Sequence, residues 1–282
     1  MSSDRAFEEK RAPLWFFPVG ILIGWIGTLC GIGGGLFAGP LLHLVQGQAL
    51  KRAAATALCL VFATTSASTV TEALQENSLL SWRLILPLVA GVLAGAQAGF
   101  FFAQRLSERR LKMVFVFVMF FAGLRILFPS AASAELGEGV SSFGVRTVLA
   151  ALCSGFGGGF VSPILGVGGG LLMVPGLFFA IDGLSFTTAR ATSLAGGMVG
   201  SFRSIWLHAR AGNIAFALGI PLALGALIGA SVGVFAARYD PFVQLGKNLL
   251  GVLLVAQSIR LARQTWGSQS TLTERSERDS HT

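Results

Sequence analysis

The chain has 282 residues, of which 53% are hydrophobic and only 12% charged, and its net charge is +8. A soluble domain of this length carries about twice that share of charged residues, so the mean hydropathy of +0.72 excludes a soluble globular enzyme and predicts a polytopic membrane protein. The positive charge would raise the question of nucleic acid in a soluble protein. In a membrane protein it reflects basic cytoplasmic loops, and no nucleic-acid partner is expected.

The chain begins with a short charged segment, residues 1–13, that runs directly into apolar sequence. The segment has no small-residue cleavage site, so we expect a retained cytoplasmic tail and no signal peptide. The apolar block that follows, residues 14–47, is too long for one ordinary span. Thirty-odd helical residues cover about 50 Å, whereas the hydrocarbon core is about 30 Å thick.

A run of glycines interrupts this first block. Residues 31–36 read Gly-Ile-Gly-Gly-Gly-Leu, and Pro40 follows. Glycine costs about 1 kcal/mol relative to alanine in a helix interior, so the run predicts a break in the helix. Broken backbone at membrane depth is tolerated only where protein buries it or where it lines a polar cavity. The block is therefore either one broken crossing or a hairpin bent at the glycines.

The same pattern returns in the second half of the chain. Residues 166–171 read Gly-Val-Gly-Gly-Gly-Leu and Pro175 follows, at a constant offset of 135 residues from the first copy. The sequence therefore divides into two repeats, residues 14–128 and 145–263, joined by an external linker at 129–144 and followed by a disordered cytoplasmic tail at 264–282. The eight apolar blocks are 14–47, 54–73, 84–103, 111–128, 145–181, 190–208, 214–236 and 245–263.

The distribution of basic residues decides between a crossing and a hairpin. If both first blocks are hairpins, the inner segments hold about three basic residues for each one outside, in agreement with the positive-inside rule. The outer segments then hold only Arg83, Arg146, Arg190, Arg238 and Lys247. A hairpin plus three crossings is an odd number, so the second half is inverted relative to the first. We predict an all-α polytopic membrane protein with two inverted repeats, each a glycine-broken helical hairpin plus three transmembrane helices, and with both termini cytoplasmic.

The glycines are also the predicted binding site for a small anion. Two hairpin tips that meet near the midplane would present unpaired backbone N–H groups and the positive ends of two half-helices. The alternative is that the glycines only allow helices to cross closely. The predicted site residues are Gly33, Gly34, Gly35, Gly168, Gly169, Gly170, Thr56, Thr192 and Arg203.

Two of these assignments leave alternatives open. Thr56 and Thr192 are expected to donate hydrogen bonds to the anion, although helical hydroxyls often bond their own backbone. Arg203 either holds the anion or extends to the membrane interface. Replacement of Gly34 by leucine is expected to abolish transport while leaving folding largely intact.

Motifs of soluble chemistry are missing from the sequence. The glycine runs lack the Lys-Ser or Lys-Thr of a phosphate-binding loop, and there is no His-Glu-x-x-His motif, paired intramembrane carboxylate or Ser-His-Asp set. We therefore expect no enzyme activity, no metal and no cofactor. The expected partners are a small anionic substrate and the lipid bilayer.

The duplicated Gly-x-Gly-Gly-Gly hairpins, each followed by a proline and then by a helix that begins Ala-x-Thr, resemble the TauE/SafE family over residues 14–263. The resemblance implies a secondary transporter in the bacterial inner membrane that exports sulfite, sulfoacetate or a related small anion. The rival hypotheses are a passive anion channel of the same fold and a membrane accessory protein without transport activity.

Overall fold

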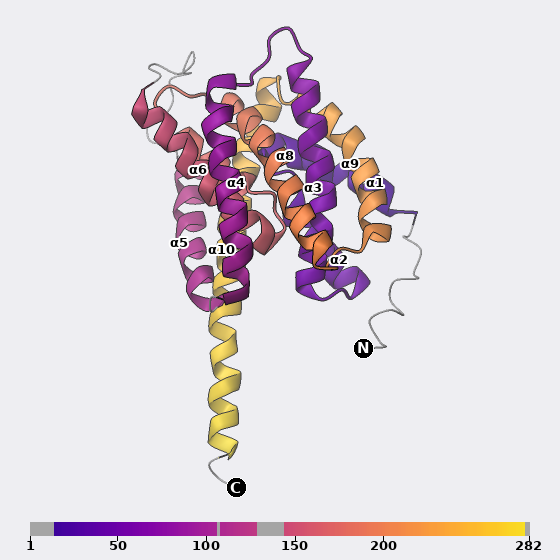
Figure 1. Cartoon of the computed structure of the whole chain (residues 1–282), viewed down its shortest axis with the longest axis vertical. Coiled ribbons are helices and arrows are strands. Elements are labelled where there is room, and N and C mark those ends of the chain that lie inside the picture. The colour runs from indigo at the N-terminus through magenta and orange to yellow at the C-terminus, as the bar shows by residue number, and fades with distance from the viewer. Residues whose placement is uncertain (1–13, 106–107, 129–143, 280–282) are drawn as a thin grey trace. The chain divides into compact units, whose positions relative to one another are not determined.

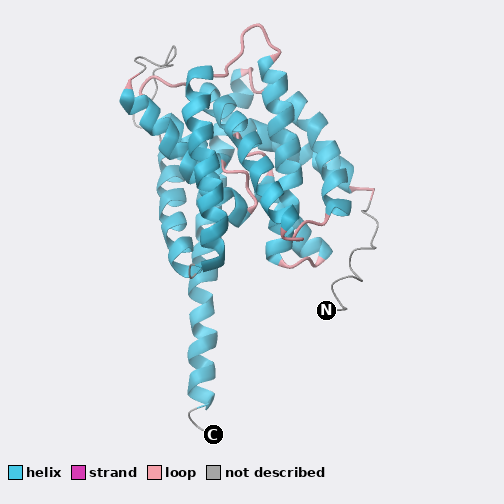
Figure 2. Ribbon diagram, in the orientation of Figure 1, coloured by secondary structure: helices cyan, strands magenta, loops and turns pink. Residues whose placement is uncertain are grey.

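The computed structural model describes residues 14–105, 108–128 and 144–279, and within these ranges all the regular secondary structure is helical (Figure 2). Five of the helices, α3, α4, α6, α9 and α10, are long and apolar enough to cross a membrane, as expected for a multi-pass membrane protein. The helices are α1 (Phe16–Cys30), α2 (Gly35–Gln46), α3 (Leu50–Ala73), α4 (Trp82–Arg105), α5 (Glu108–Leu127), α6 (Val145–Leu165), α7 (Gly170–Ala180), α8 (Phe186–Arg210), α9 (Phe216–Ala236) and α10 (Asp240–Asp279).

The first block of each half is broken at its glycines. Helix α1 ends at Cys30 and α2 begins at Gly35, and α6 and α7 end and begin at the equivalent positions. The glycines between them adopt φ angles of 75°, 72° and 81° in the first half and 69°, 74° and 80° in the second, at Gly31, Gly33, Gly34, Gly166, Gly168 and Gly169. Side chains disfavour this left-handed region, which explains why both copies need glycine there.

The first block of the second half, residues 145–181, folds back on itself as a hairpin. Helix α7 runs antiparallel to α6, because a Cβ on Gly158 would touch the Met173 side chain and one on Gly176 would touch Ser154. In the first block the chain turns in the same way at its tip, where a Cβ on Gly34 would lie 2.7 Å from the Ile23 side chain. The chain thus turns back at the glycines of both halves.

Two compact units make up the chain. One comprises the described residues up to 102 and those from 144 to 247, and the other comprises the described residues of 103–128 and 248–279. In the smaller unit, α5 packs on α10 through small residues. A Cβ on Gly123 would lie 2.9 Å from the Gly251 carbonyl oxygen.

Helix α3 lies at the centre of the larger unit (Figure 1), and 78% of its most apolar 18-residue window is buried. It packs against α2, α8 and α9. Two separate apolar clusters surround the hairpins, one drawn from α1, α2, α3 and α9 and the other from α4, α6, α7 and α8. The clusters use equivalent positions: Phe16, Ala38, Leu42 and Leu222 in the first correspond to Ala151, Met173, Leu177 and Leu88 in the second.

Each half packs its first helix along a helix of the other half. Helix α1 of the first half packs along α9 of the second (Figure 1), and α6 of the second packs along α4 of the first. Glycines bring the backbones together at equivalent points. A Cβ on Gly24 would lie 2.8 Å from the Ala226 Cα, and one on Gly159 would lie 2.8 Å from the Val92 Cα. These glycines therefore serve the close packing of the two helix pairs.

The C-terminal segment differs from its predicted state. The sequence predicts disorder from residue 264, whereas α10 continues to Asp279. Residues 264–279 contain one glycine and no proline, and extending an existing helix needs no new nucleation. The predicted N-terminal tail (1–13) and most of the predicted linker (129–144) lie outside the described residues.

Candidate functional site

The two hairpin tips, residues 31–35 and 166–170, meet in the larger unit. A Cβ on Gly35 would collide with the Gly166 carbonyl oxygen, and a Cβ on Gly170 would collide with the Gly31 carbonyl oxygen. These two contacts are equivalent at the offset of 135 residues. The structure therefore brings together the six glycines that the sequence places in the site, Gly33, Gly34, Gly35, Gly168, Gly169 and Gly170.

Helices α3 and α8 pack against the tips. The Val61 side chain of α3 fills the space beside Gly33 and Gly168, and a Cβ on Gly197 of α8 would lie 3.3 Å from the Gly168 carbonyl oxygen. Val61 and Gly197 are themselves equivalent positions at an offset of 136. Both tips are thus held between the second helices of the two halves.

Each tip combines the ends of two helices. Helices α2 and α7 begin at Gly35 and Gly170, and neither has a side chain that caps its first turn. The first N–H groups of a helix have no acceptor within the helix, and the aligned peptide dipoles place about half a positive charge there. Two such ends meeting in a water-poor interior favour a bound anion.

A buried arginine adds a full positive charge at the first tip. Arg190, near the start of α8, has a side chain that is 1% exposed. Its Nη1 donates a hydrogen bond to the Thr28 carbonyl oxygen over 3.1 Å, and its Cγ lies 2.9 Å from where a Cβ on Gly31 would be. The neighbouring Ser193 hydroxyl donates to the Gly31 carbonyl oxygen over 3.2 Å. The Arg190 side chain is therefore part of the wall of the first tip.

Arg190 belongs to a cluster of three charged side chains. Its Nη2 lies 4.0 Å from Glu72 Oε2, and the other oxygen of that carboxylate lies 2.7 Å from Arg238 Nη2. Glu72 Oε1 also accepts a hydrogen bond from the Leu79 backbone N–H. We call Arg190, Glu72 and Arg238 the charged cluster.

The other predicted site residues have partners elsewhere. Both threonine hydroxyls are buried and accept hydrogen bonds from the opposite half, Thr56 from the Ala215 backbone N–H over 3.0 Å and Thr192 from the Ser81 backbone N–H over 3.3 Å. Arg203 donates to the side-chain oxygen of Gln97 on α4. The hydrogen bonds of these three side chains are therefore made to residues outside the two hairpin tips.

The prediction for Gly34 needs correction. Its φ is +81°, and a Cβ would lie 2.7 Å from the Ile23 side chain and 3.0 Å from that of Leu60. Leucine at this position would strain the backbone and overpack the hairpin. The expectation that such a variant folds normally is therefore wrong, and a test of the site must use other residues.

Sequence reasoning missed Arg190 and Glu72. Arg190 was assigned to an outer segment, although it stands at the boundary of an apolar block. A signal for Glu72 is present, since it is the sole charged residue of the block 54–73. An ionisable residue inside a membrane segment is a functional-site hypothesis by default.

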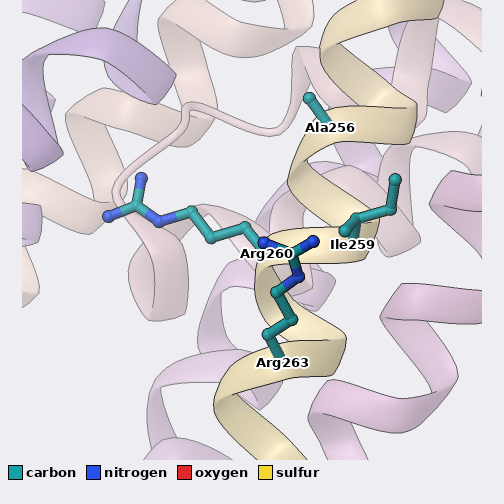
Figure 3. Close-up of a pocket in the computed structure, with 4 residues that line it drawn as sticks. All are labelled: Ala256, Ile259, Arg260 and Arg263. Atoms are coloured by element: carbon teal, nitrogen blue, oxygen red, sulfur yellow. The ribbon is translucent and has the colours of Figure 1, made fainter.

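A surface pocket lies in the smaller unit, which contains none of the candidate site residues described above (Figure 3). All of its lining residues, Ala256, Ile259, Arg260 and Arg263, come from α10. Both arginines are exposed. It contains none of the repeated glycines, and a pocket on one face of one helix lacks the converging groups of a specific binding site.

Comparison with known proteins identifies relatives over nearly the whole chain. A family profile described as "Sulfite exporter TauE/SafE" matches residues 2–126 and 151–281. Two curated proteins called "Probable membrane transporter protein", from Xylella fastidiosa strains 9a5c and Temecula1, are 28% and 27% identical over 254 residues, which cover 88% of this chain and 94% of each relative. No solved structure matches the chain.

Proposed function

Because the chain belongs to the TauE/SafE sulfite exporter family of membrane proteins, we propose that it is a secondary transporter of small anions. The first candidates for the substrate are sulfite and an organosulfonate such as sulfoacetate. Transport would proceed by alternating access in a bacterial inner membrane, with both termini cytoplasmic. The name of the family and the description of the curated relatives as membrane transporters support this class of function.

The observation that carries the proposal is the meeting of the two hairpin tips beside a buried arginine. Two helix N-termini and one guanidinium converge on the same small region of the larger unit. The two N-termini and the guanidinium carry positive charge that would favour an anion over a cation, although the negative C-terminal ends of α1 and α6 lie at the same tips. The backbone N–H groups at the starts of α2 and α7 would come within reach of the oxygen atoms of the anion, whereas the Gly33 N–H donates to the Gly27 carbonyl oxygen.

The exchange of contacts between the halves supports alternating access. Each hairpin is packed on a helix of the opposite half, so movement of one hairpin is coupled to both repeats. A hairpin plus three crossings inverts the second half in the membrane. Two inverted halves around one central site can open it to either side by equivalent motions.

The proposal is tested by counterflow in proteoliposomes. Vesicles with purified protein are loaded with unlabelled sulfite, thiosulfate or sulfoacetate and placed in a trace of the same anion carrying radioactive sulfur. A transporter accumulates the label transiently and saturably, because it exchanges internal for external anion. With the membrane potential held at zero, a passive channel equilibrates the label without overshoot, and an accessory protein moves none.

A further inference from the structure

The charged cluster has unused hydrogen-bonding capacity. Arg190 Nε and Nη2 have no hydrogen-bond partner, and neither has Glu72 Oε2, although all three atoms are buried. The Nε and Nη2 groups form one edge of the guanidinium, the edge that binds a carboxylate or another oxyanion through two parallel hydrogen bonds. The distance of 4.0 Å from Nη2 to Glu72 Oε2 is too long for such a bond. Glu72 therefore faces this edge without occupying it.

Charge in the cluster does not balance. The ionisable groups that act on Arg190 are Glu72, Arg238 and the Cys30 thiol. With two arginines and one carboxylate, the cluster carries one net positive charge. Glu72 is paired with Arg238 at 2.7 Å, so the buried Arg190 charge has no counter-ion in hydrogen-bond contact, and an anion at its free edge would stabilise it.

Exposure changes in steps along the cluster. The Arg238 side chain is 27% exposed, Glu72 is 3% exposed and Arg190 is 1% exposed, and Arg190 touches the first tip. The order from the surface inward is thus positive, negative, positive.

The charged cluster has no counterpart at the positions that the repeat makes equivalent. The positions equivalent to Glu72, Arg190 and Arg238 are His208, Ala54 and Gln104. His208 forms a hydrogen bond between Nε2 and the Pro163 carbonyl oxygen over 2.9 Å. Packing that the fold requires is duplicated in both halves, whereas the charged cluster, with Glu72 from the first half and Arg190 and Arg238 from the second, has no equivalent copy.

From these observations we propose that the free edge of Arg190 binds the transported anion, and that Glu72, held 4.0 Å from this edge by Arg238 and the Leu79 N–H, is a tethered negative charge that lowers the affinity for the anion. This inference rests on the proposed function. When the anion binds, Glu72 retains its ion pair with Arg238 and its hydrogen bond from the Leu79 N–H. Binding and release of the anion involve no covalent step. The Glu72 carboxylate also helps to release the anion, because its negative charge repels that of an anion bound at the neighbouring edge of Arg190.

A purely structural role for Arg190 makes different predictions. An arginine that only caps the end of α1 through the Thr28 carbonyl would stabilise the fold whether or not an anion is present. Its loss would then lower stability without changing the dependence on anion concentration. The readout must therefore be anion affinity, measured separately from stability.

The experiment uses the purified full-length chain in detergent. The thermal unfolding midpoint is titrated with sodium sulfite, thiosulfate or sulfoacetate at constant ionic strength, and counterflow of the same anions is measured in proteoliposomes. The variants are Glu72→Gln, Arg190→Lys, Arg190→Met and the double variant Glu72→Gln/Arg190→Met. The matched control is Arg146→Gln, which removes an exposed arginine that is paired with Asp182 at 3.2 Å.

The proposal predicts opposite shifts for the two partners. Glu72→Gln keeps the acceptor for Leu79 but removes the competing charge, so the half-saturating anion concentration falls about tenfold and release slows. Arg190→Lys raises that concentration about tenfold, since a lysine ammonium cannot form the bidentate pair of hydrogen bonds that a guanidinium edge forms. Arg190→Met and the double variant lose the anion-dependent shift, and Arg146→Gln behaves as the wild type.

Two results separate the inference from the proposed function. If the wild type shows counterflow and Arg190→Lys and Glu72→Gln both leave the half-saturating concentration unchanged, Arg190 is structural and the inference is rejected while the transporter stands. If the wild type neither binds nor exchanges any of the three anions, the proposed function fails and the inference fails with it. Should Arg190→Met not fold, the lysine and glutamine variants still decide the matter.

Discussion

Alanine at Gly159 should separate two helices from opposite halves of the chain. Gly159 of α6 lies against the backbone of α4, and a Cβ there would be 2.8 Å from the Val92 Cα and 2.9 Å from the Val92 carbonyl carbon. Carbon atoms in good contact are about 3.5 to 4.0 Å apart. The obstructing atoms are backbone, so no side-chain rotation relieves the collision. The two helices must move apart by roughly 1 Å.

The same helix offers a matched control two residues away. A Cβ on Gly157 would meet only the end of the Leu172 side chain, at 3.9 Å. Both substitutions gain up to about 1 kcal/mol of helix propensity, and only Gly159→Ala also carries an overpacking cost of about 1 to 3 kcal/mol. The difference between the two variants therefore isolates the cost of separating α6 from α4. We expect Gly159→Ala to be less stable than Gly157→Ala by about that amount.

The measurement is the free energy of unfolding of each variant in mixed micelles, from titration with a denaturing detergent and circular dichroism as the signal. Both variants are compared with the wild type in one detergent and at one protein concentration. Equal stabilities for the two variants, or a more stable Gly159→Ala, would show that α6 and α4 are not in backbone contact. The exchange of contacts between halves would then be wrong at this point.

Three further predictions use the same assay. Gly24→Ala, which meets Ala226 at 2.8 Å across the equivalent contact, should cost about as much as Gly159→Ala, by the same overpacking. Thr56→Val and Thr192→Val each remove the acceptor of a buried backbone N–H, so each should cost about 1 to 3 kcal/mol; an accompanying loss of sulfite-dependent stabilisation would restore the hydroxyls to the anion site, and its absence would leave them structural. Arg146→Gln removes a pair whose side chains are 82% and 78% exposed, so the stability should change by less than about 1 kcal/mol, and a larger loss would contradict the exposed placement of this arginine.

Much of the fold follows from the pattern of the sequence. The repeated glycines predicted where each long apolar block breaks, and the structure has helix ends at Cys30 and Leu165 with the following helices at Gly35 and Gly170. Local backbone chemistry decides these features, because a run of left-handed residues needs glycine in any surroundings. The six glycines of the candidate site were predicted for the same reason.

The charged cluster could not be assembled from local pattern. Arg190 stands at the start of one helix and Glu72 near the end of another, 118 positions apart in the chain. Their proximity depends on how α8 packs against α3, which no periodicity within either segment encodes. Thr56 and Thr192 show the converse. Their hydroxyls were correctly recognised as polar groups in apolar helices, but the bonds they form across the halves need the tertiary structure.

The exchanged helix contacts also bear on how the protein is made and how it arose. While the ribosome is still synthesising the second half, α1 has no α9 to pack on, so its glycine-lined face stays open to lipid or to the insertion machinery. Neither half can complete its own packing, and maturation has to wait for the last helices to enter the membrane. Before the gene was duplicated, the same contacts would have joined two separate copies of one shorter chain.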